Sequence, residues 1–249
     1  MNPDIETEVR ELQSLRRGQS EGPSNAISAA LSIDDAYRVQ ARLVTLLKEG
    51  VGGWKVAIGP EGRAVAAPLF ASTIMPSGST LSFTSDTKIE TELAFKLKRD
   101  LPPPRSPYTR QGILDAISTV QCAFEIVQPR RGGNNIAFAS FLADNLANGC
   151  TVLSGTEAHP GDGVADIEAV IFRDDARIAT GRHQAGDPIL PLLQYANAPR
   201  DHLGGLLSGQ VVITGSFTGA IPVDAPARYI GSVGTFAPVD VWFRRVVNE

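Results

Sequence analysis

The sequence predicts an α+β fold in which a helical N-terminal segment precedes a larger β-rich domain. Strand-like runs dominate from residue 51 onward, and they do not alternate regularly with helical runs as a doubly wound α/β sheet requires. The 24 glycines and 17 prolines are spread along the chain, which indicates many tight turns. We therefore expect a helical segment over residues 1–50 and one domain with a substantial core over residues 51–249.

Two helices are expected in the N-terminal segment. Residues 5–20 are charged and favour the first helix. The second begins after Ser32, whose hydroxyl is suited to cap it, and Asp35 lies in the first turn, where the helix dipole favours negative charge. Gly50 is its expected end. The apolar residues at helical spacing between these limits are Ala36, Val39, Leu43, Leu46 and Leu47.

Strand and helix signals follow in order along the rest of the chain. The strand-like runs are residues 54–58, 80–83, 89–97, 124–127, 164–172, 177–180, 211–214 and 239–243. Helices are expected at residues 110–120, where Ile113, Ile117 and Val120 share one face, and at residues 188–196.

The composition, 43% hydrophobic and 20% charged, is that of an ordinary globular protein. A net charge of -4 and a sequence pI near 5.5 argue against nucleic acid or anionic membranes as partners. No run approaches the roughly 18 apolar residues of a membrane span, and the polar start lacks a signal-peptide core. Cys122 and Cys150 are too few for a disulfide framework or a Cys-rich zinc site. A cytoplasmic protein is expected.

Glu90 and Glu92 stand in a run that alternates between apolar and polar residues. In a β-strand both carboxylates project from one face, roughly 7 Å apart. They repel each other, and a bound cation removes that cost. Glu125 is a third acid inside an apolar run, and such acids are seldom buried without a partner or a metal. The pattern also fits an outward-facing pair that meets lysines and solvent, and spacing alone leaves both readings open.

Lys55 stands between Trp54 and Val56 in a short apolar strand. Such a lysine often keeps its stem on apolar surface and its ammonium in water. If instead it faces a metal-bound substrate, it can carry a proton or stabilise an enolate.

Two polar loops also suit a binding site. Asp144 and Asn145 either close an Asx-turn or orient a ligand or a metal-bound water. The loop at residues 214–219 either offers backbone N–H groups and the hydroxyls of Ser216 and Thr218 to a carboxylate, or is an ordinary loop. The histidines share no spacing with the acids and are expected on the surface or in loops; they are His159, His183 and His202. Without a nucleophile-elbow motif, serine-hydrolase chemistry is not expected.

In combination these segments resemble the fumarylacetoacetate hydrolase superfamily, and specifically its 2-keto-4-pentenoate hydratase/4-oxalocrotonate decarboxylase branch. The similar segments occur in family order over about residues 30–245; they are residues 33–40, 54–58, 90–102, 124–127, 143–145, 179–181 and 215–216. The resemblance implies a mixed β-roll flanked by helices, assembled into a homo-oligomer. It also implies that Glu90, Glu92 and Glu125 bind one Mg²⁺ or Mn²⁺, with Lys55 facing the substrate and Ser216 near it.

The chain departs from the family pattern around the expected substrate pocket. Ala57 and Gly59 stand where the family has a glycine and a threonine, so a hydroxyl beside Lys55 is missing. Ala147 and Asn148 stand where it usually has serines, or a serine and a cysteine. The metal site is intact by this comparison, and the pocket is altered.

The reading that follows is a divalent-metal-dependent hydratase that converts a 2-hydroxy-2,4-dienoate into a 4-hydroxy-2-oxo acid, as in the catabolism of aromatic compounds. The cation would hold the substrate's carboxylate and C2 oxygen, so that the C2 carbonyl accepts electrons. Lys55 and Asp144 are the expected catalytic residues, and the expected substrate-binding residues are Asn145, Asn148, Ser216 and Thr218. The alternatives are a 4-oxalocrotonate-type decarboxylase, an acylpyruvate hydrolase and a non-catalytic assembly subunit.

Overall fold

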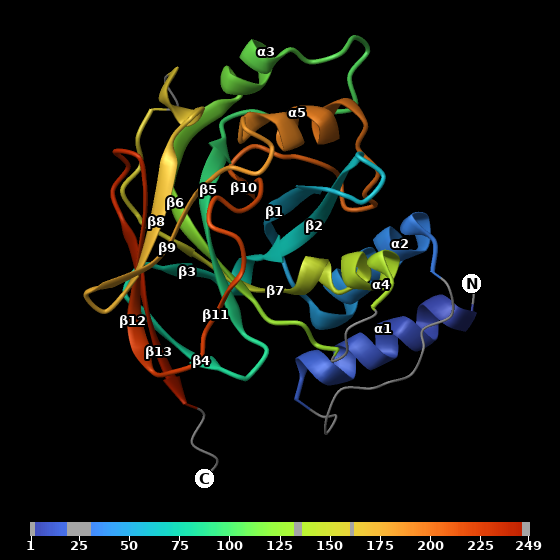
Figure 1. The fold of residues 1–249 in the computed structure, drawn as a ribbon. Helices are drawn as coiled ribbons and strands as arrows, with labels where there is room; N and C mark the ends of the chain where they lie inside the picture. The colour runs from blue at the N-terminus through green and yellow to red at the C-terminus, as the bar shows by residue number, and fades with distance from the viewer. Residues whose placement is uncertain (1–2, 19–30, 132–135, 160–161, 246–249) are drawn as a thin grey trace.

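The computed structural model describes residues 3–18, 31–131, 136–159 and 162–245, and it folds into two β-sheets with helices at one end (Figure 1). The larger sheet has the strand order β2-β1-β10-β5-β6-β7-β3, with β11 paired to β5, and the smaller has the order β4-β13-β12-β8-β9. Both sheets are mixed. In the larger sheet β1 pairs β10 in parallel and β5 pairs β6 in antiparallel fashion, and in the smaller sheet β13 pairs β4 in parallel and β12 in antiparallel fashion. The α+β class expected from the sequence is confirmed.

The elements have the following bounds. Strands of the larger sheet are β1 Val51–Ile58, β2 Ala64–Phe70, β3 Ile74–Pro76, β5 Lys88–Leu97, β6 Ile117–Val127, β7 Asn148–Leu153, β10 Val211–Ile213 and β11 Ile221–Pro222. Those of the smaller sheet are β4 Ser79–Phe83, β8 Glu168–Arg173, β9 Ala176–Arg182, β12 Ala227–Val233 and β13 Val239–Arg245. The helices are α1 Pro3–Arg16, α2 Ile33–Leu47, α3 Arg110–Leu114, α4 Phe138–Ala143 and α5 Ile189–Asn197, with short 3-10 turns at Ala71–Thr73, Asn145–Ala147 and Asp162–Val164.

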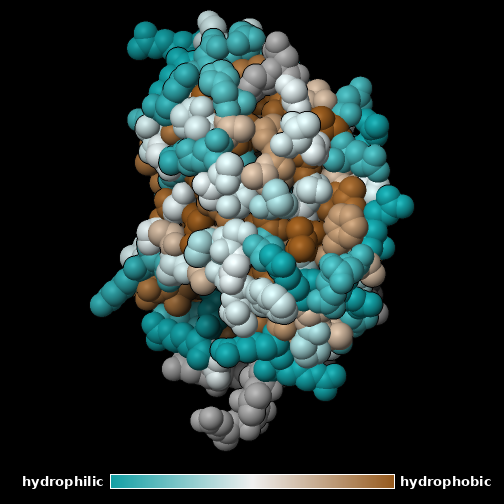
Figure 2. Space-filling view, turned by 90° about the vertical axis from the view of Figure 1, so that its left-hand side faces the viewer, coloured by the Kyte–Doolittle hydropathy of each residue, from teal (hydrophilic) through white to brown (hydrophobic). Residues whose placement is uncertain are grey.

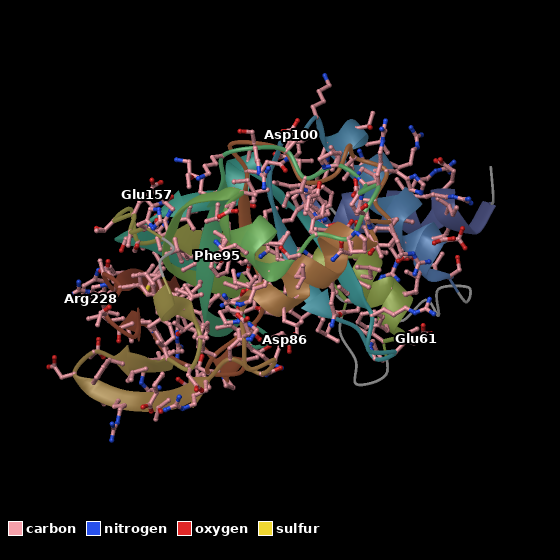
Figure 3. The ribbon with its side chains drawn as sticks, turned by 90° about the horizontal axis from the view of Figure 1, so that it is seen from above. Glu61, Asp86, Phe95, Asp100, Glu157 and Arg228 are labelled. Atoms are coloured by element: carbon pink, nitrogen blue, oxygen red, sulfur yellow. The ribbon has the colours of Figure 1, made fainter. Side chains whose placement is uncertain are left out.

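The main core lies between the two sheets. Phe95 and Phe124 point into it from the larger sheet, and Tyr229 does so from the smaller one. The sheets approach closely where β12 crosses β6, because a Cβ at Gly231 would lie 2.5 Å from the Phe124 ring. In the view from above, Phe95 lies near the middle of the molecule, whereas Glu61 and Arg228 lie toward opposite sides (Figure 3). Alternate residues of β5 and β6 therefore fill this core, and the others face the opposite side of the larger sheet.

A second apolar cluster attaches the helices to that opposite side. It joins Val9 and Leu12 of α1 and Leu43 of α2 to Val65 and Ala67 of β2. Figure 1 shows α1, α2 and α4 grouped beside β1 and β2. The helices thus cover one end of the face that carries the alternate residues of β5 and β6. None of the described helices is long and apolar enough to cross a membrane.

The predicted N-terminal helices are confirmed, with one corrected boundary. Ser32 caps α2 in a capping box, because its hydroxyl accepts the Asp35 N–H and the Asp35 carboxylate accepts the Ser32 N–H. The helix ends earlier than Gly50, because Lys48 adopts the left-handed conformation at φ 56° and forms the C-cap. Residues 19–20 of the first predicted helix lie outside the described residues.

The helix predicted at residues 110–120 is wrong beyond its first turn. It stops at Leu114, and Ile117 and Val120 belong to β6, which pairs β5 along its whole length. The β-branched residues of this segment gain more from pairing with β5 than from continuing a helix, which is a tertiary effect. The strand predicted at residues 164–172 starts only at Glu168. Strands β2, β3, β7, β11 and β12 were not predicted.

Candidate metal centre and its adjoining cavity

Three glutamates converge on the face of the larger sheet that points away from the main core. Glu90 of β5 lies directly opposite Glu125 of β6, and Glu92 stands two residues farther along β5 on the same side. One carboxylate oxygen from each lies within 4.8 Å of the other two. The convergence expected from the strand pattern is confirmed. The reading of Glu90 and Glu92 as an outward-facing pair in solvent is wrong, because Glu92 is 0% exposed and Glu90 is largely buried.

The surroundings disfavour negative charge on these carboxylates. Burial, followed by repulsion from Glu125, raises the pKa of Glu90 to about 7. The same two causes, together with Glu90, raise the pKa of Glu92 well above its ordinary value. Acids held ionised in such a place require a nearby positive charge.

Lys55 supplies one positive charge from β1. Its Nζ lies 2.6 Å from Glu125 Oε2 and donates to the Leu146 carbonyl at 3.3 Å. Burial lowers the pKa of Lys55, but the three glutamates outweigh it and leave that pKa raised. Lys55 is only 7% exposed, so it is not a surface cation.

The remaining contacts of the carboxylates suit a divalent cation. Asn148 Nδ2 donates to Glu125 Oε1 at 2.8 Å, and the Gly215 N–H donates to Glu92 Oε2 at 2.8 Å. Glu92 Oε1 is buried and has no hydrogen-bond partner among the described residues. Three carboxylates with a free buried oxygen and a single ammonium form the oxygen-rich, negatively charged site that Mg²⁺ or Mn²⁺ prefers.

A left-handed turn brings two of these contacts into place. Asn145, Leu146 and Ala147 have φ values of 54°, 53° and 58°. A left-handed non-glycine residue costs roughly 1–2 kcal/mol, and asparagine tolerates it best. The turn is held because Asn145 Nδ2 donates to the Pro68 carbonyl at 3.1 Å and Leu146 is buried against the helices. It directs the Leu146 carbonyl to Lys55 and delivers Asn148 to Glu125.

Asp144 lies before this turn and binds arginines. Its Oδ1 accepts from Arg16 at 3.0 Å, and its Oδ2 accepts the Arg130 N–H at 3.1 Å. These contacts attach α1 to the segment that carries the turn. Asn145 likewise uses its amide on backbone, so the Asx-turn considered from the sequence is replaced by a left-handed turn.

The loop after β10 lies beside the carboxylates. The Ser216 Oγ is buried without a hydrogen-bond partner among the described residues. Thr218 has a different position from the one expected, since its hydroxyl accepts the Thr91 N–H at 3.2 Å. The loop therefore offers the hydroxyl of Ser216 to a ligand and uses that of Thr218 to bind β5.

A cavity of about 440 Å³ adjoins this loop. Gly215 both lines the cavity and binds Glu92, which places the cavity next to the carboxylates. The lining residues include apolar side chains, amides and one histidine; they are Ala57, Ile58, His183, Gln184, Ala185, Leu190, Pro191, Gln194, Thr214, Gly215 and Ser216. Ala57 is thus a pocket residue. A Cβ at Gly59 would instead meet the Phe138 ring at 3.2 Å.

His183 lies in a loop, as the sequence allows for the histidines, but it is not on the surface. It follows β9, is only 6% exposed and lines the cavity. Gln184 and Gln194 were also missed as lining residues. The chain brings them to β1 and β10 only through long-range packing, and no local pattern marks them.

Comparisons with known proteins identify relatives in sequence and in fold. No family model matches the chain. It is 27% identical over 242 residues to the 2-keto-4-pentenoate hydratase of Paraburkholderia xenovorans (strain LB400), covering 90% of this chain and 89% of the relative. It is 25% identical over 246 residues to the 2-hydroxyhexa-2,4-dienoate hydratase of Comamonas testosteroni, covering 90% and 92%.

Solved structures share the fold. The 4-oxalocrotonate decarboxylase from Pseudomonas putida G7, complexed with magnesium and adipate, superposes with a TM-score of 0.83 at 17% identity and covers 98% of both chains. The 2-hydroxyhepta-2,4-diene-1,7-dioate isomerase from Mycobacterium marinum gives a TM-score of 0.57 at 15% identity, covering 80% of this chain and 77% of its own. The chain thus resembles 2-keto-4-pentenoate hydratases in sequence over nine-tenths of its length and shares the fold of 4-oxalocrotonate decarboxylase, which supports the resemblance to that branch of the fumarylacetoacetate hydrolase superfamily.

Proposed function

We propose that this protein is a divalent-metal-dependent hydratase that adds water to a 2-hydroxy-2,4-dienoate and yields a 4-hydroxy-2-oxo acid. The observation that carries the proposal is the buried cluster of Glu90, Glu92 and Glu125, with Lys55 in contact, beside an uncharged cavity. The hydratase names of the sequence relatives support the same reaction class. Mg²⁺ is the expected cation, and Mn²⁺ suits the same oxygen ligands.

The three glutamates would hold the cation, which supplies a Lewis acid that draws electrons toward the substrate's C2 oxygen. Lys55 has three N–H donors, of which Glu125 and the Leu146 carbonyl occupy two. The third is free to donate to the substrate's C2 oxygen or to carry a proton. Ser216 Oγ, also without a partner, is suited to bind the substrate's carboxylate.

The reaction balances as a tautomerisation followed by an addition. A proton leaves the C2 hydroxyl and another is delivered to C5, which leaves a C3–C4 double bond conjugated to the C2 carbonyl. Water then gives its hydroxyl to C4 and a proton to C3. Lys55 is the proposed proton carrier, and the apolar side of the cavity limits the entry of further water.

The cavity favours hydration over decarboxylation of an enedioate. A second substrate carboxylate would need a cation to pair with it in a partly enclosed pocket. None of the described residues that line the cavity is a lysine or an arginine, and Ile58, Leu190 and Pro191 form much of its wall. A substrate with an uncharged distal end fits this wall.

A substrate panel tests the proposal. Purified protein with Mg²⁺ would be assayed with 2-hydroxypenta-2,4-dienoate and with a 2-oxo-3-enedioate, following loss of the conjugated chromophore and identifying the products. We expect hydration of the monocarboxylate, abolished in Glu92→Gln and retained in Glu157→Gln, a matched change on a half-exposed residue that pairs with Lys96. Release of CO₂ from the dicarboxylate alone would favour decarboxylation, and cation binding without turnover of either would favour an assembly subunit.

A further inference from the structure

His183 is a buried residue to which the proposed reaction assigns no role. It follows β9, and its ring packs edge-on against Phe217 with centroids 5.1 Å apart. Its two ring nitrogens both have partners. The Ala185 N–H donates to Nδ1 at 3.2 Å, and Nε2 lies 3.2 Å from the Thr214 carbonyl. Because Nδ1 accepts, the proton resides on Nε2, which donates to that carbonyl.

The Thr214 carbonyl belongs to the same peptide group as the Gly215 N–H. One end of this peptide accepts from His183, and the other donates to Glu92 Oε2 at 2.8 Å. His183 is thus connected to the metal-centre carboxylate through a single planar unit.

Gly215 allows this peptide to rotate away from its observed orientation. Its φ is 114°, a region open mainly to glycine, so no side chain opposes rotation of the peptide. A flipped peptide would turn the Thr214 carbonyl toward the Glu92 carboxylate, and the two oxygens would repel each other. The hydrogen bond from His183 holds the orientation that favours Glu92.

The two carboxylate oxygens of Glu92 therefore have different roles: Oε2 accepts the Gly215 N–H, and Oε1 is left for a cation. With Oε2 held by Gly215, the buried Oε1 has no hydrogen-bond partner among the described residues, and Glu92 offers an oxygen within 4.8 Å of oxygens of Glu90 and Glu125. The neighbouring backbone is also attached to β5, because Phe217 donates its N–H to the Thr91 carbonyl at 2.9 Å. The loop is thus held to β5 at Phe217, and the peptide between Thr214 and Gly215 is held separately by His183 and Glu92.

We propose that His183 is a positioning residue of the metal centre, which acts through the Thr214–Gly215 peptide to aim Glu92 at the cation. This inference rests on the proposed function, because it needs the cation to bind at the three glutamates. It assigns His183 no contact with the reacting atoms. The loss of His183 should therefore weaken binding of the cation even when no substrate is present.

The test is calorimetric titration of the metal-free protein with Mn²⁺ alone. His183→Phe keeps a ring beside Phe217 but removes the Nε2 donor, and we expect cation affinity to fall about tenfold, at the low end for groups that orient metal ligands. His183→Gln places an amide N–H near the same carbonyl and should stay close to wild type. The exposed His202, changed to Phe, is the matched control and should leave affinity unchanged.

Each variant is first shown to be folded by circular dichroism. If His183 mattered only for folding, the folded His183→Phe and His183→Gln variants would bind Mn²⁺ with the same affinity. Wild-type affinity in His183→Phe, or an equal loss in His183→Gln, would overturn the proposal. If His183→Phe fails to fold, His183→Asn replaces it, because its shorter amide does not reach Thr214 and should bind as weakly. A wild type that binds no Mn²⁺ would overturn the metal-dependent function and this role together, whereas unchanged variants with a binding wild type would overturn only this role.

Discussion

At the scale of residues, the candidate metal centre is a largely buried group of side chains with more negative than positive charge. Three carboxylates face one ammonium, and Asn148 and Gly215 each satisfy one carboxylate oxygen. The alternation of residues along β5 was enough to predict that Glu90 and Glu92 share a face. The contact of Lys55 with Glu125 could not be predicted from local sequence patterns, because it joins β1 to β6, and β10 and β5 lie between these strands in the sheet.

The raised pKa of Glu90 predicts a pH dependence for the metal-free protein. Burial and Glu125 raise this pKa from 4.5 to about 7, so the folded state binds more protons than the unfolded state between these values. Stability therefore falls as pH rises through this window, by on the order of 3 kcal/mol. Urea unfolding in a chelating buffer from pH 5 to 8 measures this. Glu90→Gln should show a smaller decline, because Glu92, whose pKa is also raised, still contributes, and a decline as large as that of the wild type would assign it to another group.

Lys55 is predicted to serve turnover and not cation binding. Lys55→Met roughly keeps the side-chain volume and removes the charge that competes with a cation for Glu125. Affinity for Mg²⁺ should stay the same or increase, while turnover falls about 100-fold or more, as for a proton-transfer group. Lys96→Met, on β5 and paired with Glu157 at the surface, is the control and should keep normal turnover. Near-normal turnover in Lys55→Met would remove Lys55 from the mechanism.

At the scale of elements, helix α1 is attached to the site's flank by buried ion pairs. Arg16 contacts Asp144, and Arg131 contacts Glu8 and Glu11 of α1. Burial, followed by repulsion from Arg130, lowers the pKa of Arg16 to about 10, and the contact with Asp144 opposes this shift. The sequence predicted the helix, but the pairs lie more than 100 residues apart in the chain and have no local signal.

This arrangement predicts a ranking of two substitutions. Asp144→Asn leaves Arg16 and Arg130 facing each other without a counter-charge, and should lower the free energy of unfolding by about 3–5 kcal/mol. Arg16→Met leaves Asp144 paired with Arg130 and removes the repulsion, so its cost should be smaller. Urea unfolding measures the decrease in the free energy of unfolding for each variant. A larger decrease in Arg16→Met than in Asp144→Asn would contradict the assignment of Asp144 as the central partner.

The element that the sequence misjudged most is the segment at residues 110–120. This segment mixes β-branched residues with small ones, and the spacing of its apolar residues is compatible with either a helix or a strand. Pairing with β5 decides the outcome, and the same pairing places Glu125 opposite Glu90. Because residues 117–127 form one strand paired with β5, all three glutamates lie on one sheet.

At the scale of the whole molecule, the α+β class and the resemblance to hydratases were predictable because the similar segments lie in family order along the chain. The closure of the two sheets on one core and the cavity were not, since they depend on contacts between distant strands. The structure also leaves strands β4 and β9 at the edges of the smaller sheet. Figure 2 shows apolar side chains near the centre of the face on that side of the molecule, among polar ones.

These edges and apolar side chains agree with our expectation of a homo-oligomer. Exposed strand edges are a liability that a second copy can cover, and Trp242 of β13 is 47% exposed. Multi-angle light scattering in dilute buffer should give a mass that is a multiple of 26.5 kDa. A monodisperse peak at 26.5 kDa across the concentrations tested would contradict the expectation.

The central claim is that Glu90, Glu92 and Glu125 bind one divalent cation, and crystals grown with Mn²⁺ test it most directly. An anomalous difference map locates the metal independently of any assumption about the ligands. The account predicts one strong peak between the three carboxylates, within roughly 2.0–2.4 Å of an oxygen from each, as for oxygen-bound cations of this size, and no such peak in Glu92→Gln. A centre in which Lys55 remains the only cation among the three carboxylates, or a peak elsewhere in the molecule, would contradict it.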